Sequence, residues 1–318
     1  MTAATRCGFV AIVGAPNAGK STLLNKLAGS KLSIVSPKAQ TTRFRVIGIL
    51  MHDLSHKAGP QGTGGQEAGG QVRAQLLLVD TPGIFRPKRK LDRAMVAAAW
   101  TGSDDADITL VLVDARGGAT EGVREIAAKL RGSPRRLWLV LNKTDLVPRP
   151  RLLPLTAELV ALLPVERTLM VSARSGEGLG DLLDDMAQAL PEGPFLYPQD
   201  DLTDLPDRLL AAEMVREQIF LQTHEEVPYA ATVETESFLE QPDGSVRIEA
   251  TIYVSRAGHK GILIGDKGSR IRSIGERARH GLAALLERPV HLFLNVKERA
   301  GWDEERARLR AIGLDDQG

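Results

Sequence analysis

The sequence predicts an α/β protein in two parts: a mostly parallel, doubly wound sheet within residues 1–190, and an α+β unit within residues 206–318. In the first part, apolar runs typical of buried strands alternate with helical patterns, which favours parallel strands joined by helices. The chain has 318 residues, more than a single core usually holds. Between the two parts, residues 191–205 have the proline-rich, acidic composition of a linker.

The first strand is expected at Phe9–Val13, and the glycine-rich segment that follows it fits the pattern G-x-x-x-x-G-K-[ST] without a mismatch. A helix is expected to begin directly after this segment, at Thr22. In such a loop the backbone N–H groups converge on an anion at the N-terminus of the helix, where the helix dipole adds to the attraction. A glycine-rich turn that binds nothing is the alternative, and the flanking strand and helix disfavour it. The residues expected to bind the nucleotide here are Gly14, Ala15, Pro16, Asn17, Ala18, Gly19, Lys20 and Ser21 of the loop, and Thr22 after it.

Residues within this loop and in two later segments predict how it holds a nucleoside triphosphate. Lys20 would reach the outer phosphates, and the hydroxyl of Ser21 would ligate the Mg²⁺ that accompanies them. The strand 75–79 ends in Asp80-Thr81-Pro82-Gly83, where Asp80 can hold Mg²⁺ and the N–H of Gly83 can approach a γ-phosphate. In the polar segment Gln40–Phe44, either Thr41 or Thr42 can ligate Mg²⁺ while a γ-phosphate is present.

The segment Asn142-Lys143-Thr144-Asp145 follows another buried strand and predicts guanine specificity. The Asp145 carboxylate can accept two hydrogen bonds from guanine, whereas adenine lacks that pair of donors. The stem of Lys143 can lie on the base, and Asn142 can tie the segment to the phosphate loop. Further along, the backbone N–H groups of Ser172 and Ala173 are expected to meet the guanine O6.

Taken in order, these five segments resemble the signature motifs of the translation-factor-like GTPases, which have a P-loop GTPase fold. The resemblance implies GTP and GDP as ligands, Mg²⁺ bound by Ser21, Thr42 and Asp80, and a potassium ion held with the help of Asn17. Lys20, Asn17 and Thr42 are then the residues expected to carry the chemistry. Because Ile84 stands where Ras-like enzymes place a water-orienting glutamine, we expect slow intrinsic hydrolysis.

In the second part, a helix over residues 206–223 and two strands precede a G-x-x-G loop that lies between two helices. Such a loop lets a nucleic-acid strand approach the backbone closely, with basic side chains at its phosphates and apolar side chains at its bases. The order helix-strand-strand-helix-loop-helix-strand resembles a KH domain of the prokaryotic type, type II. A glycine-rich loop beside a solvated basic helix is the plainer alternative. The residues expected at RNA are Lys260, Ile264, Gly265, Asp266, Lys267, Gly268, Arg270 and Arg272.

A GTPase domain followed by one KH domain and a short C-terminal helix resembles the bacterial ribosome-assembly GTPases. The resemblance implies binding near the 3′ end of small-subunit ribosomal RNA, a GTP-dependent role in maturation of the 30S precursor, and peripheral contact with the inner membrane. Two alternatives stay open. One is a peripheral-membrane signalling switch whose second domain binds protein, and the other is an RNA-binding scaffold that holds GTP without turnover. A tRNA-modifying GTPase is disfavoured because the chain offers no further catalytic module.

Composition and charge set outer limits on these functions. The single Cys7 excludes an internal disulfide, and the chain has neither a secretory signal nor an apolar run near the ~20 residues of a membrane helix, so we expect a cytoplasmic protein. The net charge is +1, yet residues 256–279 hold seven basic against two acidic residues, which favours an RNA partner. The basic run 86–90 is a second cluster with an open role. The glycine-rich residues 57–71 are expected to be a flexible insertion.

Overall fold

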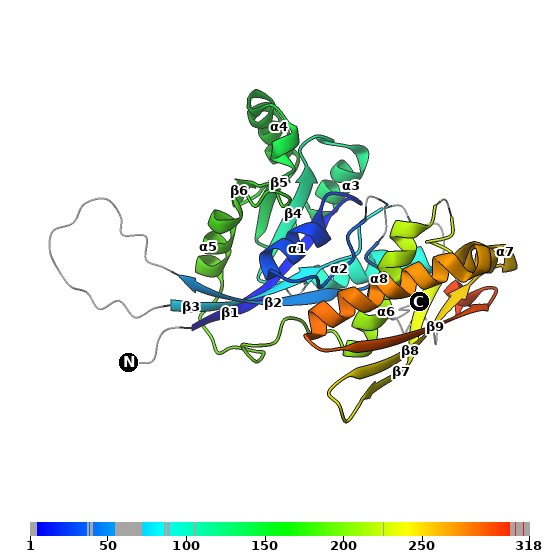
Figure 1. The fold of residues 1–318 in the computed structure, drawn as a ribbon. Coiled ribbons are helices and arrows are strands. Elements are labelled where there is room, and N and C mark those ends of the chain that lie inside the picture. Colours follow the sequence, from blue (N-terminus) through cyan, green and yellow to red (C-terminus); the bar gives the residue numbers. More distant parts are fainter. Residues whose placement is uncertain are drawn as a thin grey trace.

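In the computed structural model the chain forms two sheets with their own helices (Figure 1). The structure describes residues 5–36, 38, 41–54, 72–85, 87, 90–104, 106–224, 226–305, 309 and 314. The glycine-rich segment 57–71, Gln40, most of the basic run 86–90 and most of the expected C-terminal helix lie outside these residues.

The first sheet has six strands in the order β2-β3-β1-β4-β5-β6. Strand β2 pairs antiparallel with β3, and the other neighbours pair in parallel, so the expectation of a mostly parallel sheet is confirmed. The carboxyl ends of the parallel strands therefore meet at one edge, where ligand loops gather. The strands are β1 (Thr5–Gly14), β2 (Val46–Leu54), β3 (Val72–Asp80), β4 (Ile108–Asp114), β5 (Leu137–Asn142) and β6 (Arg167–Met170).

Helices cover both faces of this sheet because its strands are apolar on both sides. Val10 and Ile12 of β1 belong to a core with α1 (Lys20–Ala28) and α5 (Leu179–Ala189). Val13 belongs to a second core with α3 (Glu121–Leu130) and α4 (Arg149–Leu162), to which α2 (Lys90–Asp104) also contributes.

Helix α4 is absent from the sequence-based expectations, because its prolines suggest a break. Pro150 stands in the first turn, where the missing N–H would have no partner within the helix. Pro154 lies inside the helix and removes a backbone bond there. Burial of Leu152 and Leu159 outweighs that loss.

Residues 191–205 have the composition of a linker, yet the structure shows them bound to the sheet. The N–H of Ile49 donates to the Leu202 carbonyl at 2.9 Å, and the N–H of Cys7 donates to the Pro191 carbonyl at 3.2 Å. The Oε1 of the fully buried Gln75 accepts the N–H of Leu196 at 2.8 Å. The segment is thus a strap that covers part of the sheet.

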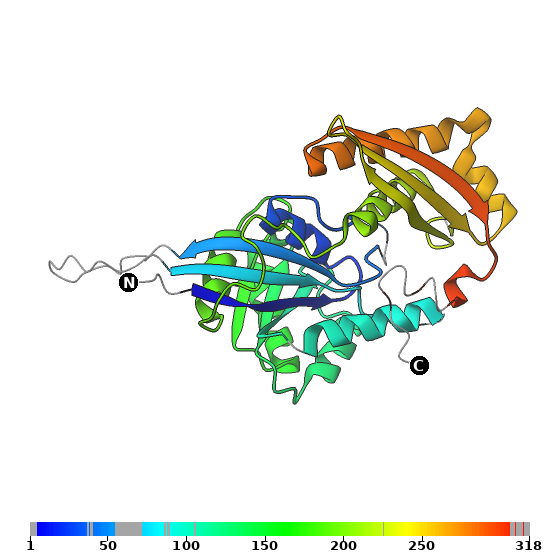
Figure 2. The same ribbon diagram turned by 90° about the horizontal axis from the view of Figure 1, so that it is seen from below.

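The second sheet has the order β7-β8-β9, with β7 antiparallel and β9 parallel to β8. Helices α6 and α8 pack on it through residues such as Met214 and Leu282. Figure 2 shows this sheet beside the end of the first sheet at which β1 and β3 finish. The order of elements matches the expected KH arrangement: α6 (Asp207–Gln222), β7 (Ala231–Glu240), β8 (Val246–Val254), α7 (Ala257–Ile264), α8 (Ser269–Leu286) and β9 (Val290–Glu298).

Candidate functional site

A pocket of about 370 Å³ opens at the carboxyl edge of the six-stranded sheet. It brings together the phosphate loop, the segment with Thr41 and Thr42, Gly83 and Lys143, which are far apart in the sequence. This is the edge where a doubly wound sheet binds its ligand. The described lining residues are Pro16, Asn17, Gly19, Lys20, Ser21, Thr22, Ile34, Val35, Ser36, Thr41, Thr42, Gly83, Arg116 and Lys143.

Lys20 is the buried cation of this pocket. Its Nζ donates to the carbonyls of Gly14 at 3.1 Å and Ala15 at 3.2 Å. Burial lowers the pKa of the ammonium to about 8, although the nearby Asp80 carboxylate opposes the shift. A phosphate would supply the negative charge that such a buried cation lacks, so the loop favours an anionic ligand.

The loop keeps its shape partly because Gly19 adopts a φ of 99°. A Cβ at this position would lie 2.3 Å from Nδ2 of Asn142. Glycine is therefore required by the backbone conformation. It is also required by the close approach of the segment Asn142–Asp145, called the guanine-type segment below. Ala18, also in the loop, accepts a hydrogen bond from the same Nδ2 at 2.9 Å, which is the tie that the sequence predicts.

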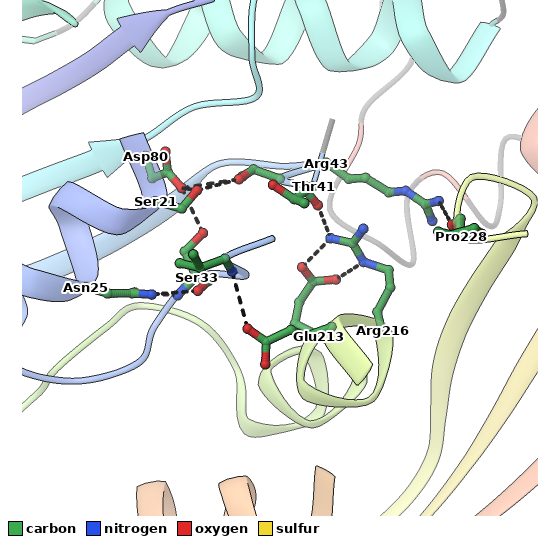
Figure 3. Close-up of polar contacts among 12 residues, drawn as sticks. Ser21, Asn25, Ser33, Thr41, Arg43, Asp80, Glu213, Arg216 and Pro228 are labelled. Atoms are coloured by element: carbon green, nitrogen blue, oxygen red, sulfur yellow. Dashed lines mark hydrogen bonds and ion pairs between the residues drawn. The ribbon is translucent and has the colours of Figure 1, made fainter. Parts of the chain in front are cut away.

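Hard oxygen donors converge beside the loop. Asp80 Oδ2 accepts hydrogen bonds from Ser21 Oγ at 2.8 Å, Ser33 Oγ at 2.7 Å and Thr42 Oγ1 at 3.3 Å (Figure 3). Its Oδ1 is buried and has no hydrogen-bond partner among the described residues. Burial raises the pKa of this carboxyl, while Lys20 and the three hydroxyls oppose the shift. A carboxylate with two adjacent hydroxyls fits Mg²⁺, which prefers oxygen ligands.

Gly83 and its neighbours form the wall behind these donors. A Cβ on Gly83 would lie 3.1 Å from Cα of Pro16, so the strand end packs closely on the phosphate loop. Thr81 is fully buried and donates from Oγ1 to the Ile12 carbonyl at 2.8 Å, and Pro82 beside it is also buried. The side chain of Ile84 belongs to the apolar core, so this position offers no polar group to a water molecule.

The guanine-type segment reaches the pocket through Lys143. This residue has a φ of 63°, and its Nζ donates to the Asn17 carbonyl at 2.7 Å and pairs with Asp114 at 2.6 Å. Asp145 lies in the following 3₁₀ turn and is exposed. Its carboxylate is thus accessible to a base laid over the Lys143 stem.

The backbone N–H groups of Ser172 and Ala173, which are expected to meet the guanine O6, make hydrogen bonds within the protein. The N–H of Ser172 donates to the Glu177 carbonyl at 3.0 Å, and the N–H of Ala173 donates to Oδ1 of Asn142 at 3.0 Å. A guanine O6 would therefore compete with these internal acceptors for the two N–H groups. Both residues are buried, and Ala173 instead orients Asn142.

Three contributors to the site escaped the sequence-based prediction. Ser33 bonds Asp80, Asp114 pairs with Lys143, and Arg116 lines the pocket. Asp114 carried a usable signal, since it ends a buried strand as Asp80 does. Ser33 and Arg116 lie in loops without a recognisable pattern, and only their position in space connects them to the site.

The G-x-x-G loop lies on the second sheet's helical layer, between α7 and α8. Two glycines of this loop have a positive φ, a conformation that favours glycine: Gly265 has φ 71° and ψ 178°, and Gly268 has φ 77°. Lys267 between them also has a positive φ, of 47°. The side chains of Asp266 and Lys267 are exposed, as a contact with a long polyanion requires.

The other expected RNA residues differ in how accessible they are. Arg272 is exposed, whereas Lys260 and Arg270 are half-buried, and Arg270 donates from Nη1 to the Ile262 carbonyl at 2.7 Å. Ile264 packs partly against the apolar core, so only part of its surface can meet a base.

Comparison with known sequences assigns both parts of the chain. The family described as "50S ribosome-binding GTPase" matches residues 9–143, and the family described as "KH domain" matches residues 226–303. The chain is 50% identical over 314 residues to the GTPase Era of Mesorhizobium japonicum, covering 99% of this chain and 95% of that protein. It is likewise 50% identical over 311 residues to the GTPase Era of Brucella suis biovar 1, covering 98% and 94%.

Two solved structures also resemble the whole chain. A variant of Aquifex aeolicus Era bound to GDP·AlF₄⁻ matches with a TM-score of 0.87 and 38% identity, and Era in complex with MgGDPNP and nucleotides 1506–1542 of 16S ribosomal RNA matches with 0.86 and 38%. Each match covers 98% of this chain and 100% of the other.

Fold and pocket together define a P-loop GTPase that carries a type II KH domain. The chain belongs to the GTPase Era family and hydrolyses GTP to GDP and phosphate. Among the described helices, none is long and apolar enough to cross a bilayer.

Proposed function

We propose that this GTPase binds small-subunit ribosomal RNA near its 3′ end and acts as a GTP-dependent switch in maturation of the 30S subunit. The observation that carries the proposal is the exposed G-x-x-G loop, Gly265–Gly268, on a KH fold. A relative that matches the full length was solved with nucleotides 1506–1542 of 16S ribosomal RNA, which supports this RNA as the partner. The 30S precursor is then the particle on which the switch acts.

We infer the contacts of the nucleotide from the residues that line the pocket. GTP and GDP bind in the pocket, with Lys20 at the outer phosphates and the Asp145 carboxylate at the guanine edge. Mg²⁺ is held by Ser21, Thr42 and Asp80, an assignment supported by their converging oxygens and by a relative solved with MgGDPNP. The bound metal neutralises phosphate charge, and this chain's own residues orient the phosphates and exclude water.

Two finer features of the site are also proposed. Asn17 helps to hold a potassium ion, since it is exposed at the rim of the phosphate loop with a φ of 63°. Intrinsic hydrolysis is slow, because the buried Ile84 gives no hydrogen-bonding group to orient water and hydrolysis then depends on Lys20 and bound ions. These features fit a switch that persists in its GTP state.

The KH loop is the proposed RNA contact. Lys267 and Arg272 meet phosphates, while the open backbone at Gly265 and Gly268 lets the strand approach. The half-buried Lys260, Ile264 and Arg270 make further contacts with the RNA beside the loop, and Asp266 tempers its affinity. We further propose domains at 1–190 and 206–318 joined by the strap 191–205, and a cytoplasmic protein with peripheral contact at the inner membrane.

Crosslinking in the presence of a non-hydrolysable GTP analogue or GDP, followed by sequencing of the attached RNA, tests the proposal. We expect reads concentrated at the small-subunit 3′ end, with fewer reads from a Lys267→Ala/Arg272→Ala variant. Arg247→Ala is the matched control, because Arg247 is an exposed arginine of the same domain that contacts Phe293 and Glu249 on β9 and β8. If neither nucleotide state gave reads at the small-subunit 3′ end, the proposal would be refuted. Crosslinks from the KH loop to a protein would favour the signalling alternative.

A further inference from the structure

Helix α6 of the second domain contacts the loop that carries Thr42 (Figure 3). Arg216, Glu217 and the backbone carbonyl of Phe220 bond residues of this loop, and Glu213 bonds Arg216. These four residues are spaced i, i+3, i+4 and i+7, so they share one face of the helix. That face meets Lys31, Val35, Lys38 and Thr41, described residues of the segment 31–43 that connects α1 to β2 in the first domain.

Arg216 is the centre of this contact and is only 2% exposed. Its Nε and Nη2 each bond a carboxylate oxygen of Glu213 at 2.6 Å. A bidentate pair of this kind fixes the plane of the guanidinium. Nη2 also donates to the carbonyl of Thr41, so the fixed plane determines where that carbonyl can lie.

Thr42, the next residue, points to the opposite side, into the metal site. Its Oγ1 lies 2.9 Å from Ser21 Oγ and 3.3 Å from Asp80 Oδ2, and the residue is 5% exposed. After it, Arg43 returns to the second domain, where its guanidinium contacts the Pro228 carbonyl at 3.5 Å and lies 5.2 Å from the Trp302 ring centroid. Both neighbours of the magnesium-binding hydroxyl are therefore held by the second domain.

The earlier half of the segment is attached to the same helix. Glu217 pairs with Lys31 and accepts the N–H of Val35 at 3.3 Å. Lys38 donates from Nζ to the carbonyls of Phe220 and Thr223 at the end of α6. Movement of α6 would thus displace the segment on both sides of Thr42.

The contact is polar, and this affects what it can do. A buried ion pair gains little net stability over apolar packing, because desolvation offsets the attraction. A cavity of about 10 Å³ adjoins Arg216 and Thr232, and Arg216 Nη1 and Thr232 Oγ1 have no hydrogen-bond partner among the described residues. Such a junction selects one position of the loop and adds little to the overall stability of the fold.

We propose that Arg216 is a positioning residue for Thr42, so that the second domain completes the GTP-selective metal site of the first. The proposal rests on the assignment of Thr42 as a magnesium ligand. Arg216 is not among the described residues that line the nucleotide pocket, so it acts through the Thr41 carbonyl and not by contact with GTP. By linkage, a nucleotide that favours Thr42 at the metal also favours the docked α6 by the same factor.

The test measures affinities of the full chain for a fluorescent non-hydrolysable GTP analogue and for fluorescent GDP, with Mg²⁺ and with a chelator. The variant is Arg216→Met/Glu213→Gln, which removes the bidentate pair without leaving a buried carboxylate unpaired. We expect the magnesium-dependent preference for the GTP analogue to fall about tenfold, with GDP affinity within about twofold of the original protein. Arg216→Lys keeps a cation but loses the two parallel N–H donors of the guanidinium. Its preference for the GTP analogue should lie between those of the double variant and the original protein.

Arg208→Ala is the matched control, since Arg208 is another α6 arginine that donates to backbone carbonyls, of Thr235 and Glu236, within its own domain. It should leave the preference unchanged. An unchanged preference in the double variant and in Arg216→Lys would overturn the proposal, as would an equal loss for GTP analogue and GDP. Thr42→Ala separates the two claims: if it keeps the preference, the ligand assignment fails and this proposal fails with it, whereas loss in Thr42→Ala alone rejects only the role of Arg216.

Discussion

The two glycine loops of this protein, both of which we propose to bind phosphates, are supported in opposite ways. The phosphate loop surrounds a buried cation, Lys20, and is tied to a distant strand through Asn142. The G-x-x-G loop exposes Asp266 and Lys267. Arg270 on α8 donates to the Ile262 carbonyl on α7 and so links the helices on either side of the loop. The first arrangement suits one small ligand enclosed on several sides, whereas the second suits a strand that passes over a surface.

The largest expected effect is at the buried cation. Lys20→Ala should lower the affinity for GTP and the rate of hydrolysis by about a hundredfold or more, because a preorganised charge at the phosphates is lost. Equilibrium binding of a fluorescent GTP analogue and phosphate release measure the two effects. RNA binding by the nucleotide-free protein should be unchanged, and a loss of RNA affinity of similar size would show that the two loops are not independent.

A Cβ added to the exposed loop should have the next largest effect. Gly265→Ala places a methyl group 2.8 Å from Cβ of Arg270 in a backbone conformation open essentially to glycine, so we expect a loss of about 1–3 kcal/mol in local stability. Hydrogen exchange of α7 and α8 in the full chain measures it. Gly258→Ala is the control, since nothing lies within 4 Å of its Cβ position and alanine favours the helix. Equal protection in both variants would contradict the expected strain.

Charge removal at the same loop should have a smaller effect. Lys267→Ala/Arg272→Ala should weaken binding of a small-subunit 3′-end RNA about tenfold and reduce the slope of log K against log salt by about 1.4, as expected for two lost phosphate contacts on a single strand. A salt titration of RNA affinity gives both values, with Arg247→Ala as the reference. An unaltered slope would mean that these side chains do not meet phosphates.

The smallest expected effect is a pH dependence confined to the phosphate loop. The charged form of Lys20 binds phosphate, and burial lowers its pKa to about 8 in the protein without ligand, so its contribution is complete below that pH and is lost above it. We expect GTP affinity to fall about fourfold from pH 7.0 to 8.5, in step with the charged fraction of Lys20. Lys20→Arg, whose guanidinium stays charged, should remove this dependence. A pH-independent affinity in the original protein would refute the role of burial.

Much of the fold follows from local pattern. Apolar runs such as 108–113 are long enough to be buried strands, and the loops between them fall at one edge of the sheet for any parallel arrangement. Helix α4 was not predicted, because a proline such as Pro154 locally disfavours a helix. Burial of Leu152 and Leu159 in the tertiary structure stabilises the helix in spite of this proline. The strap 191–205 escaped for a similar reason, since its composition does not reveal that Gln75 holds it.

The residues of the site also fall into two groups, those that local sequence indicates and those that only tertiary structure reveals. Local sequence alone indicated the phosphate loop, Asp80, the guanine-type segment and the KH loop, because each is a short run whose residue types are typical of phosphate or base contact. Tertiary structure decided that Asp114 pairs with Lys143, that the N–H of Ala173 serves Asn142, and that Arg216 reaches Thr41. These contacts join residues that are 29, 31 and 175 positions apart in the chain. Such pairs depend on how whole elements pack, and no local periodicity records that packing.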